Sequence, residues 1–193
     1  MKTETLIKGL RKIGKCRKAG IDLEPYLERF SKSSCPTRFS YLLLSERRSE
    51  DGHYSKKFKS RHPLGSVYYD ASYGFVLAVR MFSVFKIPIA VIGFEADTSD
   101  STITIKQVQG VKDAADFLAG IRWEKLLVSV VVDWARLHGA KKVEIIRAED
   151  GPWHRGADLE RAARMHLHYD VTAKRCGFRL DEKTNRYTLH LTS

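Results

Sequence analysis

The sequence predicts an α/β fold with a mixed sheet, and three of its features carry this prediction. Strand-length runs rich in Val, Ile and Phe follow one another between Phe75 and Val108, a pattern typical of an antiparallel meander. A long amphipathic helix is then expected between two strands, an order that makes the strands parallel and the crossover right-handed. Two short strands end the chain as a hairpin. The sheet is therefore expected to contain both antiparallel and parallel neighbours.

The N-terminal region, residues 1–36, is predicted to be a basic helical extension of a main domain that covers residues 37–193. Apolar residues recur every three or four positions in two stretches of it, 4–15 and 21–30. The first 62 residues contain 16 Lys and Arg against 7 Asp and Glu, whereas the remainder contains 18 against 16. Such a concentration of positive charge either attracts phosphate-bearing or acidic partners or forms a solvated surface.

The main domain is expected to begin with four strands, which are 39–44, 75–85, 87–94 and 102–108. The polar and basic stretch 45–63 is predicted to be an exposed loop. Pro88 has no N–H group, so we place it at a strand start or on an edge. Strict alternation in the last of these strands puts Ile105 and Gln107 on one face and Val108 on the other.

The most regular element is a helix from Trp123 to Leu137, whose apolar residues recur at the spacing of one buried face. A strand at 141–148 follows it. A second helical region ends at Gly177, and its apolar stripe consists of Met165, Tyr169, Thr172, Ala173 and Cys176. The closing hairpin is expected to pair 178–180 with 186–191.

Composition excludes some classes of protein and of site. No apolar run reaches the roughly 18 residues of a membrane helix, so no membrane span is expected. Three cysteines with no CxxC pair suit reduced thiols in the cytoplasm better than disulfides or a zinc site. His166 and His168 are two residues apart, which places them on different faces of a helix. No metal is therefore expected.

Element order and one short phrase carry a resemblance to a known family. A strand meander is followed by strand, helix, strand, helix and final strands, and the phrase 172–178 runs from a basic turn into Gly-Phe. Together they resemble the acyl-CoA-binding half of a Gcn5-related (GNAT) N-acetyltransferase, most closely over 102–191. The resemblance implies a GNAT-like acyl-CoA N-acyltransferase fold. In that fold the fourth strand splays from the fifth, and the pantetheine of acyl-CoA pairs with the exposed edge.

The resemblance also implies where acetyl-CoA or another acyl-CoA would bind. On the exposed strand, the corresponding residues are Gln107, Val108, Gln109 and Gly110. At the helix start that holds the diphosphate, they are Gly120, Ile121 and Arg122. Backbone N–H groups and the helix dipole favour an anion at such a position.

Acyl transfer would further require an amide at the thioester oxygen, an acid for the leaving thiolate and a base for the amine. We assign the amide to Val108. The family's tyrosine position is Ala173 here, so we assign the acid to Tyr169, one turn earlier on the same face, with core packing as its alternative role. The candidate bases are Glu144, Glu149 and Asp170.

Two classes of function follow from these residues. The leading prediction is a GNAT-like protein that binds acyl-CoA and transfers an acyl group to an amine. The alternative is a non-catalytic module of the same fold that binds nucleic acid or an acidic protein, since the loop before the helix retains a single glycine, Gly120. The segment best suited to such binding has aromatic residues between basic ones, which are Lys56, Lys57, Lys59 and Arg61.

Overall fold

The structure is a computed structural model, and it describes residues 2–14, 17–32, 39–47, 71–81, 85–111, 113–151, 154 and 158–191. Its strands are β1 Arg17–Lys18, β2 Ser40–Arg47, β3 Tyr73–Met81, β4 Phe85–Asp97, β5 Thr102–Gly110, β6 Lys142–Ile146, β7 Arg179–Asp181 and β8 Arg186–His190. Its helices are α1 Lys2–Lys12, α2 Glu24–Phe30, α4 Ala115–Leu118, α5 Trp123–Leu137, α6 Leu159–His166 and α7 Thr172–Arg175. A 3₁₀ turn, η1 Ala148–Asp150, and a π-helix, η2 Leu167–Val171, complete the described elements.

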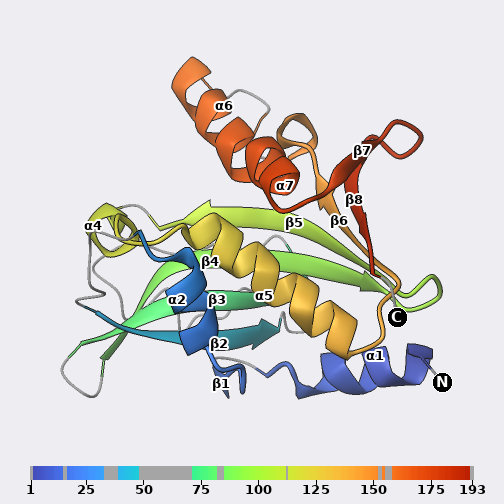
Figure 1. The fold of residues 1–193 in the computed structure, drawn as a ribbon, viewed down its shortest axis with the longest axis horizontal. Coiled ribbons are helices and arrows are strands. Elements are labelled where there is room, and N and C mark those ends of the chain that lie inside the picture. Colours follow the sequence, from blue (N-terminus) through green and yellow to red (C-terminus); the bar gives the residue numbers. More distant parts are fainter. Residues whose placement is uncertain are drawn as a thin grey trace.

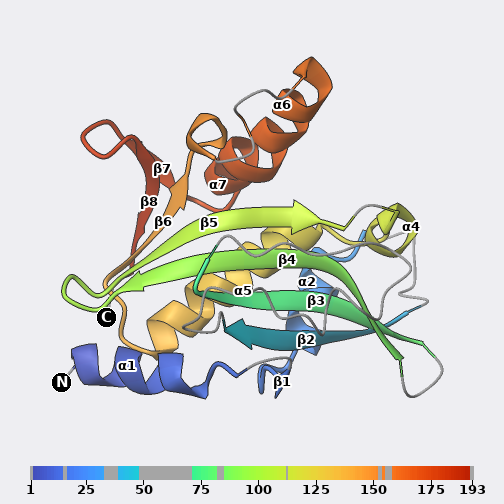
Figure 2. The ribbon, with the colours of Figure 1, turned by 180° about the vertical axis from the view of Figure 1, so that it is seen from behind.

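The described strands form one eight-stranded sheet in the order β1-β2-β3-β4-β5-β6-β8-β7. Strands β5 and β6 run parallel, and the other described neighbours are antiparallel. Helix α5 connects the parallel pair and lies across one face of the sheet, and Figure 2 looks onto the other face. The predicted mixed α/β sheet is confirmed, as is the terminal hairpin of β7 and β8.

Helix α5 forms the centre of the core, as its apolar period predicts. Its buried residues include Trp123, Leu126, Leu127, Val130, Val131 and Trp134. Leu137 was expected on the same face but is 76% exposed at the last position of the helix. The glycine that follows, Gly139, has φ 77°, a conformation that glycine adopts without strain and that ends the helix.

The N-terminal region packs onto the same core. Leu6 and Leu10 of α1 and Phe30 of α2 are buried in the cluster that α5 forms with the sheet. The Tyr26 hydroxyl donates to Asp133 Oδ2 of α5 at 3.0 Å, and burial together with this bond raises the pKa of Tyr26 to about 12. The residues predicted as an extension therefore contribute to the core of the sheet domain.

Two sequence-based predictions about the first strands need correction. Residues 45–47 were placed in a loop, but they continue β2 and pair with β3. Pro88 lies inside β4, which is an interior strand, rather than at a strand start or an edge. The β3–β4 register shifts there, so that Leu77 pairs with Ala90 but Ala78 with Pro88. A bulge interrupts the ladder at this point, and a proline is tolerated there because its missing N–H costs no regular bond.

Strand β5 contains a second bulge, at Lys106, because its pairing with β4 skips that residue. One extra residue reverses the alternation of side chains beyond it. Val108 therefore lies with Ile105 in the buried cluster beneath α5, whereas Gln107 lies beside the position of a Gly93 Cβ on the other face. The prediction that Ile105 shares a face with Gln107 is wrong for this reason.

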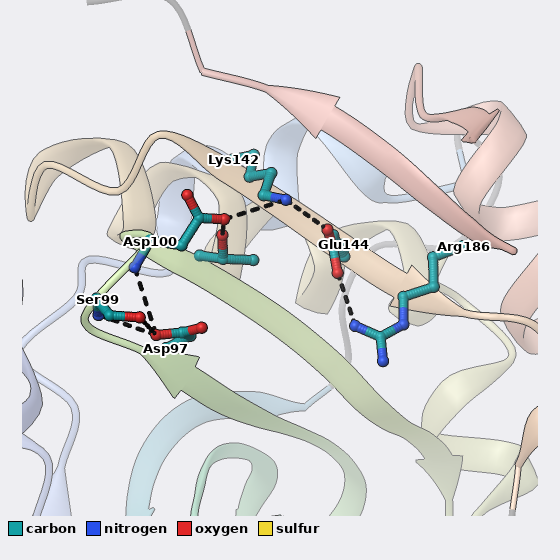
Figure 3. Close-up of polar contacts among 7 residues, drawn as sticks. Asp97, Ser99, Asp100, Lys142, Glu144 and Arg186 are labelled. Atoms are coloured by element: carbon teal, nitrogen blue, oxygen red, sulfur yellow. Dashed lines mark hydrogen bonds and ion pairs between the residues drawn. The ribbon is translucent and has the colours of Figure 1, made fainter. Parts of the chain in front are cut away.

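A cluster of four charged residues joins β6 to its neighbours at the end where it pairs with β5 (Figure 3). Lys142 Nζ lies 3.2 Å from Asp100 Oδ2 and 2.9 Å from Glu144 Oε1, and Arg186 Nη1 donates to Glu144 Oε2 at 2.8 Å. Burial acts to raise the pKa of Glu144, but the hydrogen bonds from Arg186 and Lys142 outweigh it and leave that pKa below its usual value. The cluster therefore clamps the paired end of the two parallel strands.

Candidate functional site

The parallel strands β5 and β6 pair at one end and diverge at the other (Figure 1). Their pairing begins with Thr102 opposite Lys142 and ends with Ile105 opposite Ile145. Beyond that point β6 still pairs with β8 on its other side, but no described strand pairs with the β6-facing edge of β5. The backbone of β5 from Lys106 onward is therefore available to a side chain or a ligand.

Tyr169 of η2 places its hydroxyl on this unpaired edge. The Val108 N–H donates to the Tyr169 hydroxyl oxygen at 3.2 Å, and the hydroxyl donates to the Lys106 C=O at 3.3 Å. The Tyr169 side chain is 3% exposed, so both contacts are shielded from water. One phenol thus satisfies two backbone groups for which β6 provides no partner.

The wide turn of η2 brings Tyr169 to the strand. A π-helix is rare, and one inserted between helical segments is frequently found at a functional site. Here it lies between α6 and α7, and the Thr172 hydroxyl donates to the Leu167 C=O at 3.0 Å. Ala173, at the family's tyrosine position, is fully buried in the core. The displaced Tyr169 is therefore the residue whose phenol reaches β5.

The residues assigned to the exposed strand divide into two groups. Val108 lies on the side of α5, and Gly110 does too, since a Cβ at Gly110 would lie 3.5 Å from the Trp123 ring. The side chains of Gln107 and Gln109 form a pair of their own, in which the Gln107 amide donates to Gln109 Oε1 at 2.9 Å. The start of α5 and the end of β5 are therefore neighbours at Gly110.

The start of α5 is held by contacts with the preceding chain. The Arg122 N–H donates to the Phe30 C=O at 2.9 Å, and the Ile121 N–H donates to the Leu118 C=O at 3.1 Å. Two of the amides assigned to a diphosphate therefore already have partners within the chain. The Arg122 side chain itself is exposed and does not cap the helix.

The uncapped amides of α5 lie one residue further along than the sequence suggested. The first N–H groups of an α-helix have no acceptor within the helix. In α5 these groups belong to Trp123, Glu124 and Lys125, and the Leu126 N–H donates to the Arg122 C=O at 3.0 Å. An anion at this helix start would therefore meet amides of the first turn and the guanidinium of Arg122.

The three candidate bases make contacts that belong to the fold. Glu144 lies in the charged cluster of Figure 3. Asp170 is 3% exposed and accepts a hydrogen bond from the Ala148 N–H at 3.0 Å. Glu149 forms an ion pair with Arg147 on the surface. These contacts give each carboxylate a structural role.

Sequence reasoning missed one pair near Tyr169. His168 Nδ1 lies 3.0 Å from Glu124 Oε1, and the His168 ring lies 5.2 Å from the Trp123 ring. The pair joins η2 to the first turn of α5. The two residues are 44 positions apart, and no sequence spacing relates them; the adjacency of His168 to Tyr169 was the only signal in the chain.

Other predicted sites are placed as follows. His166 and His168 lie beside different carboxylates, those of Asp170 and Glu124. Within the described ranges, no group of three or more His, Cys, Asp or Glu side chains is arranged to hold a metal ion. Burial raises the pKa of the Cys176 thiol to about 11, so this residue is not a ready nucleophile.

No helix in the described part of the chain is long and apolar enough to cross a membrane. The basic segment that contains Lys56 lies outside the described residues.

The fold is GNAT-like. A meander leads into a parallel pair with a crossover helix, and the two parallel strands diverge where the sequence resemblance predicts that they splay. An aromatic hydroxyl from the following helix lies on the exposed strand. Strand order, strand direction and this divergence support the assignment.

No protein-family model matches the chain, and no curated protein matches it significantly. Similar solved structures include two mutant forms of a cAMP-binding acyltransferase from Mycobacterium smegmatis, at 10% and 12% identity with TM-scores of 0.44 and 0.42. Each alignment covers 88% of this chain and 51% or 50% of that protein. Another similar structure is an N-acetylglutamate synthase from Neisseria gonorrhoeae, complexed with coenzyme A and N-acetyl-glutamate, at 13% identity and a TM-score of 0.35. That alignment covers 89% of this chain and 31% of the synthase chain. The chain thus spans about half of the length of the first protein and about a third of the second.

Proposed function

We propose that this chain binds an acyl-CoA along the unpaired edge of β5 and transfers the acyl group to an amine. The observation that carries the proposal is the contact of the Val108 N–H with the Tyr169 hydroxyl at 3.2 Å. A backbone donor that stabilises a developing oxyanion and a phenol that protonates a thiolate are two of the groups that thioester aminolysis uses. Here they lie side by side in a buried position.

The geometry around them suits the rest of the cofactor. The pantetheine would continue along β5 toward Gly110, and the diphosphate would follow at the start of α5. The Trp123 ring lies close to the Gly110 position, so the end of β5 and the first turn of α5 are neighbours. Uncapped amides and the Arg122 guanidinium favour an anion at that turn, while Glu124 opposes it.

In this arrangement the Val108 N–H donates to the thioester oxygen in place of Tyr169. The amine nitrogen bonds to the carbonyl carbon, and its proton passes to a base. The carbon–sulfur bond then breaks, and the Tyr169 hydroxyl donates its proton to the departing thiolate. Shielding from water strengthens both interactions, because they act in a medium of low dielectric constant.

The same contact also favours a second candidate function. Tyr169 already satisfies Val108 N–H and Lys106 C=O, so it can serve as a permanent partner of β5 in a non-catalytic module. Such a module would bind nucleic acid or an acidic protein through the basic N-terminal third. The two candidates differ in whether a ligand displaces Tyr169 from the strand.

Isothermal titration with acetyl-CoA tests the proposed function. We expect saturable binding to the unmodified protein and a loss of about tenfold in affinity for Arg122→Glu, because a guanidinium on the diphosphate becomes a carboxylate. Arg179→Glu, which makes the same change on exposed strand β7, is the matched control and should bind normally. A flat titration at millimolar acetyl-CoA would leave the non-catalytic module as the function.

A further inference from the structure

The helical segment that carries Tyr169 is more exposed before η2 than after it. Helix α6 projects from the body of the protein, and Met165 is its one buried residue (Figure 1). After η2, by contrast, both Thr172 and Ala173 of α7 are buried. Asp170, which follows Tyr169, is buried and fixed by the hydrogen bond from the Ala148 N–H, whereas His168, which precedes Tyr169, is only partly buried.

His168 makes a contact with the start of α5. Its Nδ1 lies 3.0 Å from Glu124 Oε1, and its ring packs against Trp123 at a centroid distance of 5.2 Å and an interplanar angle of 54°. An ionised carboxylate only accepts hydrogen bonds, so the imidazole carries a proton on Nδ1. The ring thus combines a charge-assisted hydrogen bond with aromatic packing.

We propose that Glu124 and His168 form a latch that positions Tyr169. His168 and Tyr169 are adjacent in the π-turn, so the contact that fixes His168 against α5 also fixes where Tyr169 meets β5. The bonds that the phenol makes to Val108 and Lys106 are long, at 3.2 and 3.3 Å, and are sensitive to a small movement of η2. The consequence for catalysis rests on the proposed function, whereas the positioning is a property of the folded chain.

Amide hydrogen exchange measured by NMR tests the latch without ligand or activity. In Glu124→Ala and in His168→Phe, which retains a ring against Trp123, the Val108 amide should exchange about tenfold faster or more. The amide of Ile103, which lies in the part of β5 paired on both sides, should keep its exchange rate. Glu124→Gln retains an acceptor for the His168 Nδ1–H and should restore most of the Val108 protection.

The matched control is Glu160→Ala, which removes a carboxylate that pairs with Arg164 on the surface of α6 and should leave the Val108 amide unchanged. Unchanged Val108 exchange in both Glu124→Ala and His168→Phe would overturn the latch. So would an equal acceleration at Ile103, because that result indicates general loosening of the sheet.

The latch and the proposed function can fail separately. A protein that shows the Val108 effect but gives a flat acetyl-CoA titration retains the latch and loses the acyltransferase function. If the unmodified protein turns over acetyl-CoA, the His168→Phe variant should have about tenfold lower turnover and nearly the same acetyl-CoA affinity. The reason is that the substitution misplaces the Tyr169 hydroxyl but leaves the binding edge of β5 intact. An equal loss of affinity and turnover would contradict a positioning role.

Discussion

The backbone N–H of Val108 donates to the hydroxyl of Tyr169 at 3.2 Å, although the two residues are 61 positions apart in the chain. The contact lies on the edge of β5 beyond the point where its pairing with β6 ends. A strand edge inside a domain normally pairs with another strand, because an unpaired buried amide is costly. In this protein a side chain from a π-helix takes the partner's place. A ligand that displaces that side chain would meet both a free amide and a free phenol.

Tyr169→Phe removes the hydroxyl and keeps the ring. If Tyr169 protonates the leaving thiolate, turnover with acetyl-CoA should fall by about 100-fold, while acetyl-CoA affinity changes little. Steady-state kinetics and calorimetry on the same samples measure the two effects. Tyr26→Phe removes another phenol hydroxyl, the one that donates to Asp133 of α5, and is the matched control. Equal turnover in Tyr169→Phe and the unmodified protein would assign Tyr169 to core packing.

Gly9→Ala tests whether α1 packs against the end of α5. A Cβ at Gly9 would lie 2.2 Å from Cδ2 of His138, whose ring is held by a 2.8 Å contact between its Nδ1 and the Trp134 C=O. Alanine in a helix gains about 1 kcal/mol over glycine, but the clash should outweigh this gain and lower the free energy of unfolding by about 1–3 kcal/mol. Urea denaturation measures the change.

His138→Ala provides the control for that clash. His138→Ala removes the ring with which the new methyl group would clash. Gly9→Ala should therefore lower the free energy of unfolding much less in a His138→Ala background than in the unmodified protein. A stabilising effect of Gly9→Ala in the unmodified chain would contradict the packing of α1 on α5.

Glu144→Gln should destabilise the protein in a pH-dependent way. The pKa of Glu144 is lower in the folded protein than its usual value, so the carboxylate stabilises the fold above that usual value, and the contribution is lost as the pH falls through the folded-state pKa. At neutral pH, removing the charge should cost about 1–3 kcal/mol, because Lys142 and Arg186 lose their common partner.

Urea denaturation at neutral pH and at about pH 3 measures this difference. The gap between Glu144→Gln and the unmodified protein should shrink once the pH falls through the folded-state pKa of Glu144, which lies below the usual value. A gap that stays constant until the unmodified protein unfolds in acid would contradict a stabilising role for the charge of Glu144.

Substitutions in the basic segment outside the described residues test the alternative function, a non-catalytic module that binds nucleic acid or an acidic protein. Binding to nucleic acid through this segment should be weak and independent of sequence, and should fade near physiological salt, with a log–log slope of about −0.9 per phosphate on duplex DNA and about −0.7 on single strands. Fluorescence anisotropy should show a lower affinity for nucleic acid and a weaker salt dependence when four basic residues of the segment are replaced by Gln. These residues are Lys56, Lys57, Lys59 and Arg61. Acetyl-CoA affinity should not change. Tight, salt-resistant binding to one sequence would instead indicate a recognition module.

Local pattern was enough to predict most elements of the fold. The apolar period of α5 predicted both of its ends, and the predicted stripe of the second helical region includes four residues that are buried, Met165, Tyr169, Thr172 and Ala173. Cys176 of the same stripe is only partly buried, and the buried Asp170 was not predicted. Gly177, predicted to stop that region, has φ 85°. Each of these features depends on residues within a few positions of one another, and so periodicity and turn chemistry reveal them.

The two β-bulges could not be predicted from the local sequence pattern. Strict alternation put Val108 on the wrong face, because the extra residue at Lys106 is recognisable only from the partner strand. Pro88 was misplaced for the same reason. A bulge is a property of two paired strands, and the sequence of one strand does not show which residue its neighbour will skip.

The sequence by itself determined most elements of this protein and their order, and its resemblance to a known family led to the nomination of Tyr169 and Val108. Only the tertiary structure decided that these two residues touch, that the amides of Ile121 and Arg122 already have partners, and that His168 meets Glu124. Helices and strands follow from interactions between near neighbours in the chain. The site is built from contacts between segments tens of residues apart, which come together when burial of the shared core packs η2, α5 and β5 against one another.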